Sequence, residues 1–411
     1  QRDGVRRVSA IDATVNGSQQ TLVSNMQYRG DNRLTQCTFG NGLIDNRTYD
    51  QQGRLSSQQL SAIDSRIYSY DPNGNMVQRS TTPQNSQYQY DRLDRLTSDK
   101  IDNNSANNFS YDLNHNRLSK VLEDGSLQTQ YQHEFASNRL QAVEATIQGS
   151  DTLPAEPSSS RTYNNANRWF ELYEEGSKKA DYIYNSLGQR TRKTLYNPDT
   201  STASITIYHY DLTGKLIAET SETGEVQRDY IWSNQSPVAQ IDRNNSIDNI
   251  SYLHTDHLLT PRFATNDSQQ VIWQWEGEAF GETEADNDPD GDSNLTTVNL
   301  RFPGQYFDQE TGLHYNYFRS YDPNTGRYVQ SDPIGINGGT NAYGYAHQGP
   351  LSYYDPDGNI PVFVVTAAVG AFVNATATSL NGGSASDVFN SAVVGAATGA
   401  LGGIGFGAKG A

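Results

Sequence analysis

The sequence lacks the features that usually stabilise a small secreted domain or bind nucleic acid. Its one cysteine, Cys37, excludes an internal disulfide, so packing and hydrogen bonding must stabilise the fold. It has no run of Lys or Arg, and 47 acidic residues against 30 basic ones give a formal net charge of −17. Phosphate neutralisation requires a basic surface, so we expect no nucleic-acid partner.

The first residues show no charged segment followed by an apolar stretch. The chain begins within a repeat, so we expect it to be part of a longer protein. The sequence therefore does not identify the export route.

Aliphatic residues are scarce, whereas tyrosine is abundant. Only 35% of the 411 residues are hydrophobic, and 26 of them are tyrosines. A ring with a hydroxyl tip suits a sheet face that is partly wet, and tyrosine favours strands. We therefore predict an all-β protein in which tyrosine provides much of the packing.

A tandem motif occurs along most of the chain: Tyr, then Asp or Asn, then a turn containing Gly or Asn, then a basic residue and often Leu. Successive copies from Tyr28 to Tyr111 are 20 or 21 residues apart. The copies begin at Tyr28, Tyr49, Tyr70, Tyr90, Tyr111, Tyr163, Tyr184 and Tyr210.

This period fits two short strands and two connections, so each repeat is predicted to be a β-hairpin. The Asp or Asn can bond the backbone two residues on, and the later Gly supplies a positive φ. Between turns the pattern alternates, as in residues 204–210, which indicates one buried face and one wet face. Isolated hairpins cannot bury that face, so consecutive hairpins should join into a long sheet.

These motifs resemble the YD repeats of Rhs proteins, of the C components of insecticidal toxin complexes and of teneurins. The resemblance covers about residues 20–360. It implies tandem hairpins that spiral into a hollow shell capped by the Rhs-associated core domain. We expect repeats over residues 1–250, lead-in hairpins with an acidic insertion over 251–300, the core domain over 301–360, and the start of a variable region over 361–411.

Two motifs in the lead-in segment could bind a metal ion. His254, Asp256 and His257 are close in sequence, but on a strand His257 would face away, so structural hydrogen bonding is favoured. The acidic run with Asp286, Asp288, Asp290 and Asp292 matches the opening of a calcium loop. Its twelfth position would be Thr297 instead of Glu, so a solvated insertion is favoured over a Ca²⁺ site.

The segment from Arg301 to Gly358 carries an ordered set of landmarks: GQYFDQETGLHYNYFRSYDPNTGRY, SDPIG, NAYGY and a final DPDG. These resemble the Rhs-associated core domain, which in that family is an intramolecular aspartic protease that releases the C-terminal polypeptide. The resemblance implies that Asp332 and Asp355 are the acid pair and that Arg319 is the assisting cation.

Ionising both of two neighbouring carboxyls is costly in free energy because the like charges repel, so one of them keeps a proton near neutral pH. The ionised member can deprotonate a water while the other polarises the scissile carbonyl, and a guanidinium can stabilise the developing charge. Asp before Pro is also a common turn opener, which applies equally to Asp322, Asp332 and Asp355. Without the resemblance all three would be interpreted as turn formers, and Asp322 and Arg327 are kept as structural residues.

The same resemblance places the cut between Asn359 and Ile360. The family usually has Leu before the cut, so Asn359 is a departure that bears on the efficiency of cleavage. Beyond the cut, residues 361–380 and 388–411 are rich in Ala, Gly and Val, with small residues four apart from Gly395 onward. This segment has two interpretations: a membrane-active stretch, or a pre-toxin linker inside the shell. The linker is favoured.

The leading functional prediction is a secreted or cell-surface bacterial toxin scaffold that encloses and then severs its own C-terminal toxin. A secretion or delivery protein and an immunity protein for the toxin would be its further partners. The alternative is a non-enzymatic adhesin whose aromatic repeat surface binds carbohydrate. The residues after the cut contain no motif that identifies the toxic activity.

Overall fold

The computed structural model describes residues 1–5, 7–82, 84–147, 159–163, 168–197, 199–200, 202–243 and 247–363. In these ranges the chain forms four antiparallel sheets and two short 3₁₀ helices, and it contains no α-helix. The all-β prediction is thus confirmed for the part of the chain that the structure describes.

The first sheet has thirteen strands, and each strand pairs with the one that follows it in sequence. Its strands are β1 (Ile11–Val15), β2 (Ser18–Tyr28), β3 (Leu34–Phe39), β4 (Ile44–Tyr49), β5 (Leu55–Leu60), β6 (Asp64–Tyr70), β7 (Met76–Ser80), β8 (Asn85–Tyr90), β9 (Leu96–Ile101), β10 (Asn107–Tyr111), β11 (Arg117–Leu122), β12 (Leu127–His133) and β13 (Leu140–Ile147).

The second sheet continues the same up-and-down order through eleven strands. They are β14 (Ser159–Tyr163), β15 (Trp169–Glu174), β16 (Ser177–Tyr184), β17 (Arg190–Asn197), β18 (Thr202–Tyr210), β19 (Leu216–Thr220), β20 (Val226–Ser233), β21 (Ser236–Asp242), β22 (Asn249–Thr255), β23 (Pro261–Thr265) and β24 (Val271–Gln274).

The remaining elements come from the C-terminal part of the described chain. A four-stranded sheet holds β25 (Tyr306–Asp308), β26 (Leu313–Asn316), β27 (Arg319–Asp322) and β28 (Arg327–Tyr328), and a small sheet pairs β29 (Tyr353–Tyr354) with β30 (Val362–Phe363). The 3₁₀ helices are η1 (Gly335–Gly338) and η2 (Ala346–Gln348).

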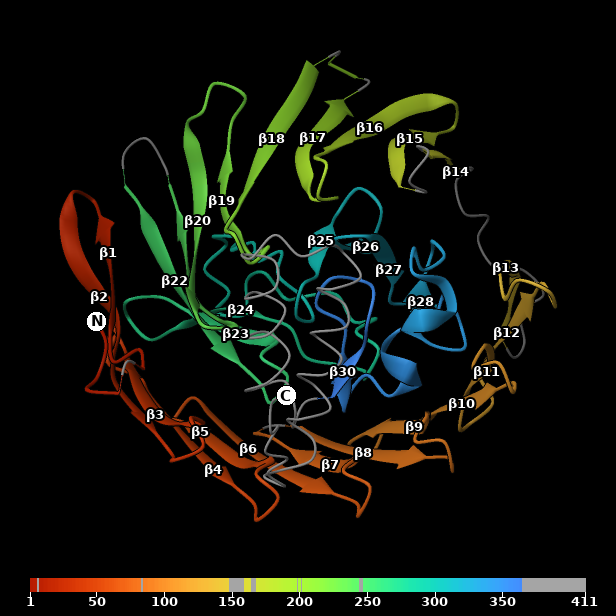
Figure 1. The fold of residues 1–411 in the computed structure, drawn as a ribbon, viewed down its shortest axis with the longest axis horizontal. Coiled ribbons are helices and arrows are strands. Elements are labelled where there is room, and N and C mark those ends of the chain that lie inside the picture. The colour runs from red at the N-terminus through yellow and green to blue at the C-terminus, as the bar shows by residue number, and fades with distance from the viewer. Residues whose placement is uncertain are drawn as a thin grey trace, which may run out of the picture.

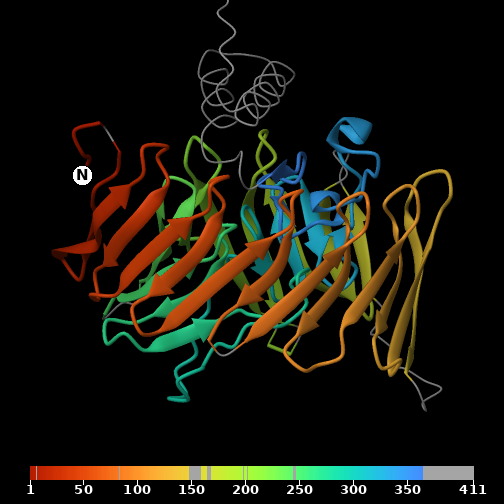
Figure 2. The same cartoon turned by 90° about the horizontal axis from the view of Figure 1, so that it is seen from below.

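The two large sheets form a curved wall around these central elements. In Figure 1 the strands β1–β13 run from the left along the bottom to the right of the view, β14–β22 return over the top to the left, and β25–β30 lie inside the curve. Figure 2 shows the strands lying side by side and slanting across the height of the wall. The wall closes where β2 contacts β21, and Asn16 donates its amide hydrogen to Asp248 Oδ2 at 3.0 Å.

The Tyr-Asp motifs whose turns the structure describes close their hairpins as the sequence predicts. In the turn after Tyr49, Asp50 Oδ1 accepts the amide hydrogen of Arg54 at 2.8 Å, and Gly53 has a φ of +81°. In the motif that begins at Tyr90, Asp94 takes the same left-handed position with a φ of +58°. The register shifts beside the tyrosine in both motifs, which marks a β-bulge at that position.

In six of the described repeats a tyrosine hydroxyl bonds to a main-chain carbonyl of the segment that precedes it. Tyr70 Oη donates to the carbonyl oxygen of Leu55 at 2.8 Å, and the guanidinium of Arg54 lies 4.6 Å from the Tyr70 ring centroid. The same hydroxyl-to-carbonyl bond recurs from Tyr28 to Val8, Tyr49 to Leu34, Tyr90 to Met76, Tyr111 to Leu96 and Tyr210 to Arg190. We call this contact the tyrosine clamp.

The inner face of the wall packs against the central segment. Tyr68, Tyr88 and Phe109 are buried with Phe280 and Leu351, whereas the neighbouring Ile67 points outward. Ion pairs add to this contact: Arg190 makes a bidentate pair with Asp308, with Nη1–Oδ2 at 2.5 Å and Nη2–Oδ1 at 2.9 Å. The wall therefore positions the central segment through both apolar and charged contacts.

We expect Tyr70→Phe to lower the free energy of unfolding by about 1 kcal/mol, because it removes one clamp and leaves the Leu55 carbonyl without its donor. Urea unfolding followed by circular dichroism measures the change. Tyr163→Phe is the matched control, since Tyr163 is 45% exposed, and surface changes stay within about 0.5 kcal/mol. Equal effects of the two substitutions would contradict the role given to the clamp.

Candidate functional site

The centre of the site is one guanidinium nitrogen shared by two carboxylates. Arg319 begins β27, Asp332 lies between β28 and η1, and Asp355 follows β29 directly. Arg319 Nη2 lies 3.0 Å from Asp332 Oδ2 and 3.1 Å from Asp355 Oδ2, and all three side chains are buried. The structure thus brings together the three residues that the sequence singled out.

Asp332 has the environment of a proton donor. Burial raises the pKa of its carboxyl to about 6, against the opposing effect of Arg319, and Asp355 adds to the rise. Its Oδ1 accepts the amide hydrogen of Ile334 at 2.9 Å, so it also opens the turn expected of Asp before Pro. The turn role and the acid-pair geometry are combined in one residue.

Asp355 holds the loop that contains the expected cut. Its Oδ1 accepts the amide hydrogens of Gly358 at 2.9 Å and Asn359 at 3.0 Å. Its Oδ2 accepts the Tyr328 hydroxyl at 2.9 Å in addition to Arg319. These four contacts tie Asp355 to the loop, to Tyr328 and to Arg319.

The expected cut lies in a short connection that is pinned at both ends. β29 pairs with β30, with Tyr354 opposite Val362, so residues 355–361 form the loop between them. Arg319 Nε donates to the Gly358 carbonyl in this loop. A Cβ atom at Gly338 would overlap both Asp332 Oδ2 and the carbonyl oxygen of Asn359, so these two oxygens lie against the same point. The carbonyl of the expected scissile bond is therefore next to the Asp332 carboxyl.

Four residues of the site were missed by the reading of the sequence. Tyr328 lies under the Arg319 guanidinium at 3.7 Å from its ring centroid, and Asn316 Nδ2 donates to the Tyr328 hydroxyl at 2.7 Å and to the Asp355 carbonyl at 2.8 Å. Gly338 leaves space for the scissile carbonyl, and Asp357 Oδ1 accepts the Asn359 amide hydrogen at 3.2 Å. All four lie in or near the core-domain string, but no spacing rule marks them.

The residues kept as structural ones lie outside the site. Asp322 accepts the amide hydrogen of Asn324 at 3.0 Å and the Thr325 hydroxyl at 2.9 Å within its own turn. Arg327 Nη2 donates to the Asn138 carbonyl of the wall at 2.6 Å. Their structural interpretation is confirmed by these contacts.

The histidine motif is also structural. His254 Nε2 pairs with the Thr265 hydroxyl at 2.8 Å, His257 Nε2 pairs with the Leu351 carbonyl at 2.9 Å, and Asp256 pairs with Arg262 at 2.8 Å. Burial lowers the pKa of His254 to about 3, so this ring is neutral. The favoured hydrogen-bonding interpretation is confirmed.

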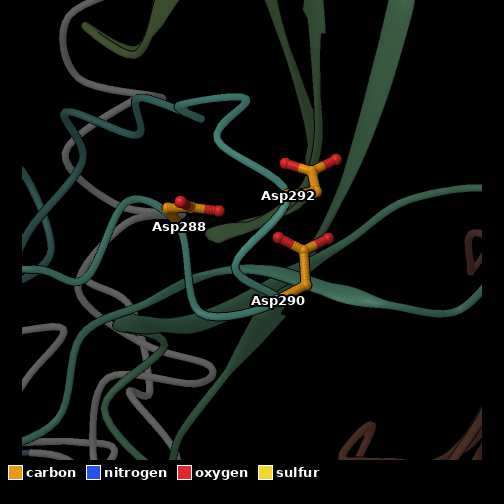
Figure 3. A group of neighbouring side chains, drawn as sticks. All are labelled: Asp288, Asp290 and Asp292. Carbon is orange, nitrogen blue, oxygen red and sulfur yellow. The ribbon is translucent and has the colours of Figure 1, made fainter.

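Three carboxylates of the acidic insertion converge. Asp288, Asp290 and Asp292 each offer an oxygen within 4.8 Å of the others, whereas Asp286 is not in this group. Figure 3 shows the three side chains on the acidic loop. Asp288 Oδ2 accepts the Ser293 amide hydrogen at 3.2 Å, and Asp292 accepts that of Asn294 at 2.7 Å. The carbonyl of Thr297 accepts Gln240 Nε2, so the twelfth position is engaged elsewhere. Calcium binding stays a prediction at this loop.

The membrane interpretation of residues 361–411 falls almost entirely on residues 364–411, which lie outside the described residues. Among the residues that the structure describes, no helix has the length and apolarity required to span a bilayer.

A wall of clamped β-hairpins around a pinned acid pair defines a YD-shell protein. The teneurin YD-shell family model matches residues 3–361, so the chain belongs to this family. The Tc holotoxin pore of Photorhabdus luminescens superposes with a TM-score of 0.70 at 17% identity, over 88% of this chain and 20% of that one. The TcdB2-TccC3 complex without its hypervariable C-terminal region gives a TM-score of 0.68 at 17% identity, over 87% of this chain and 20% of that one. At this identity the likeness shows the shell fold.

Curated relatives in sequence include toxins. The chain is 32% identical to the double-stranded DNA deaminase toxin A of Burkholderia cenocepacia over 48% of this chain and 15% of that protein. It is 39% identical to the toxin protein Tse5 of Pseudomonas aeruginosa over 30% of this chain and 9% of that protein. The chain thus matches less than a fifth of the length of either relative.

We expect millimolar Ca²⁺ to shift the melting temperature by no more than about 1 °C, because the acidic loop lacks the bidentate Glu of a strong site. Differential scanning calorimetry with Ca²⁺ and with EDTA measures this. A rise of several degrees that Asp290→Asn removes would contradict the expectation and show a calcium site. Glu222→Gln, a change of one exposed acidic residue in another part of the wall, controls for the loss of charge.

Proposed function

We propose that this chain is part of the shell of an Rhs-type toxin and that it cuts itself between Asn359 and Ile360 to release the polypeptide that follows. The observation that carries the proposal is the buried Arg319 Nη2 bound to both Asp332 and Asp355, with the Asn359 carbonyl beside Asp332. The toxin names of two relatives support the context of toxin delivery.

The chemistry follows from the unequal environments of the two carboxyls. Asp355 accepts hydrogen bonds from four donors, whereas the raised pKa of Asp332 keeps a proton available at mildly acidic pH. Asp332 can therefore protonate the Asn359 carbonyl oxygen as the tetrahedral intermediate forms. Arg319 stabilises the negative charge of the pair and, through its Nε, fixes the Gly358 carbonyl one residue before the cut.

The passenger in this proposal is the chain's own C-terminal polypeptide, enclosed by the wall. Tyrosines and ion pairs such as Arg190 with Asp308 hold the central segment against the wall. Secretion, a delivery protein and an immunity protein belong to the same proposal. A carbohydrate-binding adhesin would need the wall and not the acid pair, so the first test below also separates these two functions.

The first test replaces each member of the acid pair with its isosteric amide. In the full chain we expect Asp332→Asn and Asp355→Asn to slow self-cleavage by about 100-fold or more, and a denaturing gel measures the ratio of cut to intact chain. Asp322→Asn is the matched control, because Asp322 also precedes Pro but lies in a separate turn. Native-like cutting in both site variants would contradict the proposal. A native chain that stays intact would also contradict it and would favour the adhesin.

The second test follows cleavage with pH. Because the pKa of Asp332 is raised to about 6, its protonated form is present below that pH and is lost above it. If Asp332 is the acid, we expect the rate of cleavage to fall as the pH rises toward about pH 8, approaching about tenfold per pH unit. Intact chain recovered in urea and refolded into buffers from about pH 5 to about pH 8 gives the rates. A rate that rises with pH across this range would assign Asp332 the opposite role.

A further inference from the structure

The hydrogen bonds of Asp355 leave no lone pair for activating water. An ionised carboxylate has about four acceptor positions, two on each oxygen. Oδ1 of Asp355 accepts the main-chain amide hydrogens of Gly358 and Asn359, which fill both of its positions. Oδ2 accepts the Tyr328 hydroxyl and an Arg319 guanidinium hydrogen, which fill the other two. Asp355 is thus a clamp for the cleavage loop, and the nucleophile has to be sought elsewhere.

The residue before the cut carries a nucleophile of its own. The side-chain carbonyl of Asn359 is buried and accepts no hydrogen bond among the described residues, whereas its amide group interacts with the Asp357 carboxylate. The main-chain carbonyl of Asn359 lies beside Asp332, as the space left by Gly338 shows. One asparagine therefore has a potential base at its side chain and a potential acid at its carbonyl.

We propose that Asn359 supplies the nucleophile, so that the chain is cut by cyclisation of this asparagine instead of by hydrolysis. This inference rests on the proposed function, since it concerns the same bond, and it gives a chemical reason for Asn where the family usually has Leu. An attacking atom in the same residue as the carbonyl gains from proximity, because no second molecule has to be bound and oriented.

The step balances without a further reactant. Asn359 Nδ2 forms a bond to its own carbonyl carbon and passes one proton to the Asp357 carboxylate. Asp332 gives its proton to the carbonyl oxygen, and this proton moves to the nitrogen of Ile360 as the bond between residues 359 and 360 breaks. The products are a chain that ends in a succinimide at position 359 and a polypeptide that begins with the free amine of Ile360.

The neighbouring residues suit these roles. Burial, together with the charge of Asp355, raises the pKa of Asp357, so its carboxylate is a stronger base than an ordinary aspartate. The main-chain N–H of Asn359 donates to Asp355 Oδ1 at 3.0 Å, and this bond limits rotation of the loop on the N-terminal side of the cut. The branched side chain of Ile360 hinders the competing attack of its own nitrogen on the Asn359 side chain, which would deamidate the residue without cutting the chain.

The intact mass of the fragment that ends at residue 359 tests the inference in the native full chain. We expect a fragment lighter by one water than the product with a free carboxyl terminus, and we expect hydroxylamine to convert it to a hydroxamate. A free carboxyl terminus in freshly cut protein would overturn cyclisation while leaving self-cleavage in place. A chain that stays uncut would overturn self-cleavage and cyclisation together.

Variants of the same residue provide the second measurement. Asn359→Leu installs the usual family residue, so hydrolysis by the acid pair predicts native or faster cutting, whereas cyclisation predicts a loss of about 100-fold or more. Asn359→Gln keeps the amide but needs a larger ring, and we expect it to be slowed as well. Circular dichroism and the urea midpoint check that each variant is folded. Native-like cutting of Asn359→Leu would overturn the inference.

Discussion

The tyrosine clamp is the interaction on which the rest of the molecule depends. A wall of single hairpins has no continuous hydrophobic core along its length, so neighbouring repeats need a specific link in addition to the strand ladder. The clamp provides it by joining the hydroxyl of one repeat to the carbonyl of the preceding one, as between Tyr70 and Leu55. The guanidinium of Arg54 lies over the Tyr70 ring and is ion-paired with the turn aspartate Asp50, so it ties the tyrosine to the turn of the preceding repeat.

A regular wall then gives the central segment a fixed surface to pack on. Asp308 is buried and makes ion pairs with Arg190 and Lys193 of β17, and the Tyr321 hydroxyl donates to the Phe280 carbonyl. These contacts fix β25–β28, and β27 in turn carries Arg319. The geometry of the acid pair is therefore set by the wall through the sheet that the wall surrounds, in the way that a preorganised site requires.

Much of this could be predicted from the sequence, because the determinants of the wall are local. Asp50 and Gly53 lie within one turn, and their spacing predicts both the hydrogen bond from the backbone to the Asp50 side chain and the positive φ of Gly53. The partners of the site are distant: Asn316 contacts the Asp355 carbonyl, and Gly338 lies against Asn359. Neither has a residue type that predicts such a role. The resemblance to the Rhs core domain identified Arg319, Asp332 and Asp355, whereas Tyr328 and Asp357 became visible only through their contacts.

The central claim is that the chain cuts its own backbone at one bond, in the loop between β29 and β30. N-terminal sequencing of the polypeptide released from the purified native protein tests it most directly. We predict a single sequence beginning Ile360-Pro361-Val362. A released polypeptide that begins at any other residue, or a ragged mixture of starts such as a contaminating protease leaves, would contradict it.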